Sequence, residues 1–184
     1  AGTKVTAIAR FKINSFSSGG VARLVWIQGA AAKYRINLGV CSNDHATVGR
    51  RSKAICGVQN TAGTSICFMV SPTIVADNLL HIVFVSFDGD AGTATFVIDG
   101  ISADDAGSGE RIAPVTGTLD TGAGTVYVGR DATTGYFPGD IGFCGHREAY
   151  LTNWADFMQA GGYPKLLDES TWAQWGAQPA FWNH

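Results

Sequence analysis

Residues 79–99 constrain the fold more than any other part of the sequence. They read LLHIVFVSFDGDAGTATFVID, in which two stretches of alternating β-branched or aromatic residues flank the acidic, glycine-rich turn 88–92. Asp and Gly tolerate the left-handed backbone that a tight turn between antiparallel strands requires. In the second stretch Phe96 and Ile98 fall on one face and Val97 on the other. The segment therefore predicts an antiparallel strand pair within a two-layer sandwich.

The same alternation recurs along most of the chain. Eight segments have it, with turn-forming residues between nearly every pair: 4–13, 22–28, 34–41, 65–70, 79–87, 93–99, 125–129 and 141–145. The polar stretch 43–64 predicts a long excursion with one edge strand at 54–59, and the polar stretch 101–124 predicts a surface loop. The chain is thus expected to be all-β, with two antiparallel sheets.

Composition supports one β domain. The chain has 184 residues, 24 glycines and only 15% charged residues, which favours short strands with frequent turns over helices. A net charge of −2, with Lys and Arg spread thinly, argues against nucleic-acid binding, which needs clustered cations. No apolar run approaches the roughly eighteen residues of a membrane span, so we expect no membrane insertion.

The cysteines predict no zinc site. Cys41, Cys56, Cys67 and Cys144 have neither C-x-x-C spacing nor a Cys/His cluster. We expect buried free thiols, because cysteine is among the residues most often buried. Two disulfides are the alternative, and a secreted location would favour them.

The chain changes character after Gly145. Residues 153–158 predict a short helix capped by Thr152 or Asn153. The remainder is rich in aromatic residues, which form either a strap on the outer sheet or an interface for oligomerisation or attachment: Trp172, Trp175, Phe181 and Trp182. We therefore expect a sandwich at 1–145 and a C-terminal helix and aromatic tail at 146–184 that packs on or extends the same domain.

Four short motifs resemble the signature segment of the laminin-G-like and concanavalin-A-like jelly rolls. They are an acidic turn after a strand, the sequence FVIDG, a Val-Gly pair and an aromatic corner before a last core strand: 87–90, 96–100, 128–129 and 136–141. The resemblance implies a two-sheet antiparallel jelly-roll sandwich and glycan recognition. The tail, with Trp-x-x-Trp-Gly followed by Gln-Pro, also resembles laminin-G-like proteins of bacteriophage virions. That resemblance implies a place on the virion surface, with an extracellular location as the alternative.

Enzymatic chemistry is not expected. Glycoside hydrolases that resemble the laminarinases place acidic residues on one strand face, because retaining cleavage needs two carboxyl groups about 5 Å apart. Glu110, Glu148 and Glu169 have no acidic partner at that spacing, and no Gly-x-Ser-x-Gly elbow is present. His81 shares a strand face with Val85 and is interpreted as a structural histidine.

Calcium is the one cofactor considered, because similar domains bind it at a rim of the sandwich through carboxylate and carbonyl oxygens. The candidate ligands are Asp88, Asp90, Asp99 and Asp131. The first three are equally explained as turn formers that bond to their own backbone. Calcium therefore remains an alternative to the prediction of no cofactor.

Sugar binding needs an aromatic platform beside planar polar groups. The loop that begins with Arg130 and Asp131 and ends at Tyr136 supplies both. Tyr136 has a structural alternative, since the aromatic residue at such a corner often packs under the turn. Trp26 is a second candidate, although its place beside Leu24 in a strand is more typical of the core.

These features predict a non-catalytic carbohydrate-binding surface domain, a phage structural or receptor-binding component that recognises host polysaccharide. The alternative is a purely structural virion decoration or spike module that binds protein neighbours, and a glycoside hydrolase ranks third. The expected partners are a cell-surface glycan and, through the aromatic tail, virion proteins or a second copy of the chain.

Overall fold

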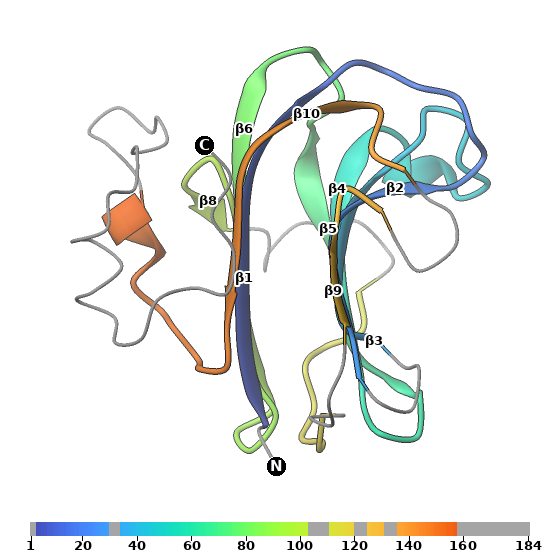
Figure 1. Cartoon of the computed structure of the whole chain (residues 1–184). Coiled ribbons are helices and arrows are strands. Elements are labelled where there is room, and N and C mark those ends of the chain that lie inside the picture. The colour runs from blue at the N-terminus through green and yellow to red at the C-terminus, as the bar shows by residue number, and fades with distance from the viewer. Residues whose placement is uncertain (1–2, 30–33, 103–110, 120–124, 131–135, 158–184) are drawn as a thin grey trace.

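The computed structural model describes residues 3–29, 34–102, 111–119, 125–130 and 136–157, in which two antiparallel sheets face each other (Figure 1). Sheet A has the strand order β10 (Gly139–Arg147), β1 (Lys4–Ile13), β6 (Leu80–Asp88), β7 (Thr93–Ile98) and β8 (Ile101–Ser102). Sheet B has the order β5 (Ser65–Ile74), β4 (Lys53–Gln59), β3 (Tyr34–Cys41), β2 (Val21–Gln28) and β9 (Thr125–Val128). The predicted all-β, two-sheet sandwich is confirmed.

Every segment predicted from alternation is a strand, but the prediction for the 43–64 stretch was wrong in one respect. β4 is not an edge strand, because it pairs with β3 on one side and β5 on the other. Its residues from Ala54 to Val58 are buried, so the excursion is confined to the residues before it, which include the 3₁₀ turn η1 (Val48–Arg50). The segment predicted as a helix at 153–158 contains a 3₁₀ turn, η2 (Trp154–Phe157), and Met158 lies outside the described residues.

The core lies between the sheets and follows the period of two. Phe96 and Ile98 of β7 are buried in it with Phe11 and Phe87, whereas Val97 faces the outer side of sheet A. Burial of these large side chains contributes about 2 kcal/mol or more each. The alternation in the sequence is therefore the alternation between the core and the outer faces.

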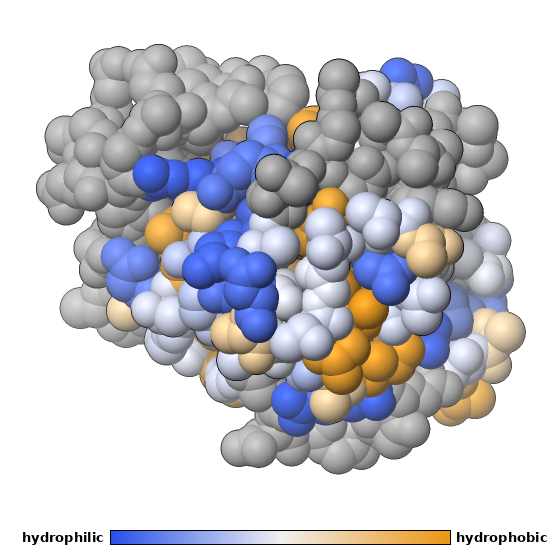
Figure 2. Space-filling model, turned by 90° about the horizontal axis from the view of Figure 1, so that it is seen from below, coloured by the Kyte–Doolittle hydropathy of each residue, from blue (hydrophilic) through white to orange (hydrophobic). Residues whose placement is uncertain are grey.

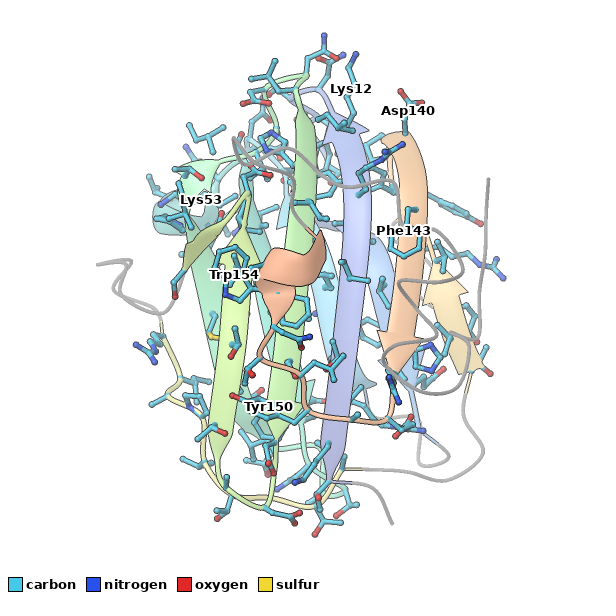
Figure 3. The ribbon with its side chains drawn as sticks, turned by 90° about the vertical axis from the view of Figure 1, so that its left-hand side faces the viewer. Lys12, Lys53, Asp140, Phe143, Tyr150 and Trp154 are labelled. Carbon is cyan, nitrogen blue, oxygen red and sulfur yellow. The ribbon has the colours of Figure 1, made fainter. Side chains whose placement is uncertain are left out.

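The outer face of sheet A is covered by the chain that follows β10. Thr6 Oγ1 donates to the Ala149 carbonyl at 2.7 Å, and the Leu151 amide donates to Ser86 Oγ at 2.8 Å. Figure 3 looks onto this face and shows Trp154, on η2, lying over the sheet. Leu151, Trp154 and Phe143 pack there on a small apolar cluster of buried residues: Ile8, Ile82, Phe84 and Val97. The described part of the C-terminal region thus packs on the outer sheet; the tail aromatics from Trp172 onwards lie outside the described residues.

One end of the sandwich is closed by residues 111–119. They bond to β5 at Phe68 and then reach the β6–β7 turn, where the Gly117 amide donates to the Gly89 carbonyl at 2.9 Å. Seen from this side, the described surface is mostly hydrophilic or of intermediate hydropathy, with several hydrophobic areas among these residues (Figure 2). Among the described residues, no helix is long and apolar enough to cross a membrane.

Candidate functional site

A β-bulge turns Trp26 away from the core. The β2–β3 register shifts between Arg23 and Val25, so that both Leu24 and Val25 are buried between the sheets. After the bulge the alternation continues with Trp26 outward and Ile27 inward. The expectation that Trp26 belongs to the core was therefore wrong, because alternation read without the bulge assigns it to the wrong face.

Strand register brings Trp26 into a row that crosses all of sheet B on its outer face. Paired positions run from Tyr127 of β9 through Trp26, Asn37 and Gly57 to Phe68 of β5. Neighbouring strands lie about 4.8 Å apart, so the row is roughly 19 Å long. Trp26 and Tyr127 stand opposite each other as neighbours at one end, and the glycine leaves a position without a side chain near the other end.

An arginine lies over each ring of this row. The guanidinium carbon of Arg23 is 4.9 Å from the centre of the Trp26 ring, and that of Arg130 is 5.5 Å from the centre of the Tyr127 ring. The guanidinium of Arg50, from η1, lies 4.4 Å from the centre of the Phe68 ring. Stacking of this kind holds a cation in place through the quadrupole of the ring.

The buried side-chain amide of Asn37 holds Arg23 at the centre of this row. Arg23 Nη1 donates to Asn37 Oδ1 at 2.7 Å, and Asn37 is only 7% exposed. Trp26 and Tyr127 are partly buried, and Arg130 is exposed. The result is a pair of aromatic rings bordered by guanidinium and amide groups whose positions are set by the sheet.

One backbone hydrogen bond joins the two ends of the predicted loop site. The Phe137 amide donates to the Gly129 carbonyl at 2.8 Å, which brings together the two ends of the loop 130–136. Arg130 reaches Tyr127 from one end, and Tyr136 stands 69% exposed at the other. Phe137, the next residue, packs edge-on against Phe11 with ring centres 5.8 Å apart.

Thus Phe137 is the aromatic residue that packs on the core at this corner, and Tyr136 is the exposed one. Asp131 lies outside the described residues. Of the predicted residues, Trp26 and Arg130 come together beside Tyr127. Sequence reasoning missed Arg23, Asn37 and Tyr127, although Val-Tyr-Val in β9 alternates in the way that turns a tyrosine outward.

The carboxylates considered as calcium ligands make hydrogen bonds within the protein. Asp88 accepts the Asp90 and Ala91 amides and pairs with Lys4 Nζ at 3.1 Å. Asp90 accepts a hydrogen bond from Thr3 Oγ1 at 2.7 Å. Where the chain is described, no three His, Cys, Asp or Glu side chains are grouped so that they could hold a metal ion.

Asp99 bonds to His81 at the end of the sandwich opposite to Asp88 and Asp90. Its Oδ1 accepts the Ile82 amide at 2.8 Å, and its Oδ2 lies 2.6 Å from His81 Nδ1. The other ring nitrogen of His81 lies 2.9 Å from Asp77 Oδ1. His81 is 6% exposed and contacts Phe11, so the prediction of a structural histidine on the core face is confirmed.

The glutamates and cysteines considered from the sequence can be assigned where they are described. Glu148 forms an ion pair with Arg35, while Glu110 and Glu169 lie outside the described residues. All four cysteines are buried free thiols, as predicted. Burial raises the pKa of the Cys144 thiol to about 12, which keeps it protonated and unreactive.

Comparison with known proteins identifies the fold. No protein-family model matches the sequence, and no curated protein is significantly similar to it. Among solved structures, the native heptameric SAP-like pentraxin of Limulus polyphemus matches 82% of the chain with a TM-score of 0.53 at 14% identity. The mouse laminin α1 chain, domains LG4-5, matches 83% with a TM-score of 0.54 at 13% identity.

A third match is the CBM40 domain of the Ruminococcus gnavus IT-sialidase bound to α2,6-sialyllactose, with a TM-score of 0.52, 14% identity and 83% of the chain covered. The chain spans 66% of the pentraxin chain, 37% of the laminin chain and 80% of the CBM40 chain. At such identities the matches establish the fold alone. The chain therefore has the concanavalin-A-like jelly-roll fold that these proteins share.

Proposed function

We propose that the protein binds carbohydrate, without catalysis, on the outer face of sheet B. The observation that carries this proposal is the pair of partly buried rings, Trp26 and Tyr127, bordered by Arg23, Asn37 and Arg130. The apolar faces of sugars stack on aromatic rings, and their hydroxyl groups bond to planar amide and guanidinium groups. Both kinds of group are present within one row of side chains.

The arrangement is also ordered before any ligand arrives. Arg23 is held by both Asn37 and the Trp26 ring, and the rings are fixed by strand pairing. A preformed site loses little side-chain entropy on binding, and this loss is one of the costs that weak sugar contacts must overcome.

Two further observations support the proposal. One similar structure, the CBM40 domain, is described as bound to sialyllactose. The described carboxylates that were considered for chemistry, Asp88, Asp99 and Glu148, are each engaged by neighbouring groups of the protein. A binding role without turnover is consistent with both.

The test is a glycan array followed by calorimetry on the glycans that bind. A single domain should bind with a Kd from roughly millimolar to high micromolar, because two rings and a few hydrogen bonds exceed the cost of association only slightly. Trp26→Ala should weaken binding about tenfold, or about 1.4 kcal/mol, through loss of stacking.

Trp154→Ala is the matched control, since it removes another partly buried tryptophan from the opposite sheet. It should leave binding per folded molecule unchanged. No binding across a broad array, or equal losses in the two variants, would remove sheet B as the binding face.

The proposal also includes a biological location for the domain. We place the domain on the surface of a bacteriophage virion, where the aromatic tail would attach it to virion proteins or to a second copy. This part rests on the resemblance of the tail sequence alone. Genes for capsid or tail proteins beside its own would support it, and a secretion signal would favour an extracellular lectin instead.

A further inference from the structure

We propose that His81 is a proton-dependent latch on the connection between the two sheets. The chain passes from β5 in sheet B to β6 in sheet A through residues 75–79, here called the crossover (Figure 1). While His81 is protonated it binds a carboxylate of the crossover and keeps the crossover closed. When His81 loses its proton, the crossover opens locally. This latch does not involve the residues of the proposed carbohydrate site.

His81 lies between two carboxylates. Its Nδ1 is 2.6 Å from Asp99 Oδ2, and its Nε2 is 2.9 Å from Asp77 Oδ1. An ionised carboxylate only accepts hydrogen bonds, so each contact needs an N–H group on the ring. The imidazolium has two such groups and the neutral imidazole has one. Only the protonated ring can therefore make both contacts.

Among the described residues, the charged groups that act on His81 are these two carboxylates. Asp77 comes from the crossover, and Asp99 comes from the turn between β7 and β8. From β1 the ring is contacted by Phe11, and the basic residues on either side of Phe11 alternate to the outer face of the sheet. His81 is only 6% exposed, so water cannot replace a lost contact unless the chain around the ring moves.

The structure indicates which of the two contacts breaks. Asp99 is also held by β6, because its Oδ1 accepts the Ile82 amide at 2.8 Å and its own amide donates to the Ile82 carbonyl at 3.0 Å. Asp77 Oδ1 accepts the Leu79 amide at 2.9 Å, a bond within the crossover itself. The single N–H group of the neutral ring should therefore stay with Asp99. The nitrogen that faces Asp77 then presents a lone pair to a carboxylate oxygen, and the two repel each other.

The crossover is anchored on both sides of this contact. The Val75 and Ala76 amides both donate to the Ser52 carbonyl, and Leu80 pairs with Lys12 of β1. None of these bonds involves His81, so they remain when the proton is lost. The opening should then be confined to the residues between Ala76 and Leu80.

The middle of the crossover has a backbone that favours release. Asn78 has a φ of 67°, a left-handed conformation that is sparsely populated by residues other than glycine. Its amide donates to the Ile13 carbonyl at 2.9 Å, and the next side chain, Leu79, is 63% exposed. Opening would relax this backbone and admit water to the end of the core where Phe11 is buried.

Amide hydrogen exchange followed by nuclear magnetic resonance tests the latch. Protection factors, which correct for the effect of pH on intrinsic exchange, would be compared at pH 6 and pH 9, on either side of the range in which histidine titrates. Those of Asn78 and Leu79 should fall about tenfold or more, the value of one charge-assisted hydrogen bond. The fall should follow the loss of the His81 proton, measured by its ring carbon shifts. The Ile82 amide, and the Gly117 amide at the opposite end of the sandwich, should keep their protection.

Two variants separate the latch from a purely structural role. In Asp77→Asn the side-chain oxygen can accept the Leu79 amide while the nitrogen donates to the neutral His81 ring, so the crossover should stay closed at both pH values. Asp90→Asn is the matched control. It makes the same change at the opposite end, where Thr3 donates to the side chain, and should leave the pH dependence intact.

Protection of Asn78 and Leu79 that does not change with pH would overturn the proposal, as would a pH dependence that persists in Asp77→Asn. An equal fall at Gly117 would also overturn it, because the opening would then be global. If Asp77→Asn does not fold, the unmodified protein still decides the question. The fall in protection and the titration of the His81 ring must share one midpoint, and different midpoints would refute the latch.

Discussion

Replacement of His81 by Phe should destabilise the protein by about 2–4 kcal/mol. The phenyl ring can keep the contact with Phe11, but it removes the hydrogen bonds of 2.6 Å and 2.9 Å to Asp99 and Asp77. Hydrogen bonds to charged groups contribute roughly 1.5–3 kcal/mol each. The Asp77 and Asp99 side chains are 34% and 32% exposed, so water would replace part of the hydrogen bonding that the two carboxylates lose.

The loss should also depend on pH. Burial favours a lower pKa for His81, but the hydrogen bonds to Asp99 and Asp77 outweigh it, and the pKa is raised from 6.5. The folded protein therefore holds the proton more tightly than the unfolded chain does. The resulting stability is fully present below about pH 6.5 and is lost as pH rises through the folded pKa.

Thermal unfolding at pH 6 and pH 9 measures both effects. His81→Phe should lower the midpoint of thermal unfolding by roughly 5–12 °C at pH 6 and by less at pH 9. The control is His146→Phe, because burial lowers the pKa of His146 and its linkage to stability therefore acts below pH 6.5. An equal loss at both pH values would show that the proton on His81 adds nothing to stability, and it would refute the linkage.

Three further predictions concern the fold. Gly89→Ala should lower the unfolding temperature strongly, because its Cβ would lie 2.1 Å from the Gly117 carbonyl oxygen; an unchanged temperature would mean that residues 111–119 do not close this end. Phe137 is partly buried, so Phe137→Ala should cost about 2 kcal/mol in denaturation, whereas Tyr136→Ala should cost under about 0.5 kcal/mol; the reverse order would contradict their assigned exposure. All four thiols should resist a water-soluble thiol reagent until denaturant is added, whereas fast labelling of the native protein would contradict their burial.

Much of the fold could be predicted because alternation reports directly on burial. The strand pair around the β6–β7 turn and the core positions of β7 follow from residue type alone, since a period of two leaves a single choice of inward face. β4 was wrongly predicted as an edge strand. It is buried across most of its length, and a continuously buried strand has no alternating pattern to detect.

The candidate site was harder to predict, since it depends on register between distant strands. The bulge after Arg23 decides that Trp26 faces outward, and pairing with β9 decides that Tyr127 stands beside it. Neither event leaves a local mark in the sequence. Arg130 and Trp26 were proposed as site residues because of their side-chain types. Strand pairing then shows that both lie beside Tyr127 in one row.

The central claim is that sugar binds on the outer face of sheet B, and chemical-shift mapping by nuclear magnetic resonance tests it most directly. The labelled protein would be titrated with the glycan that binds best on the array. The largest changes are expected at the Trp26 indole N–H and at the amides of Arg23, Asn37 and Tyr127. Changes concentrated on sheet A, or at the His81 end of the sandwich with Trp26 unaffected, would contradict the claim.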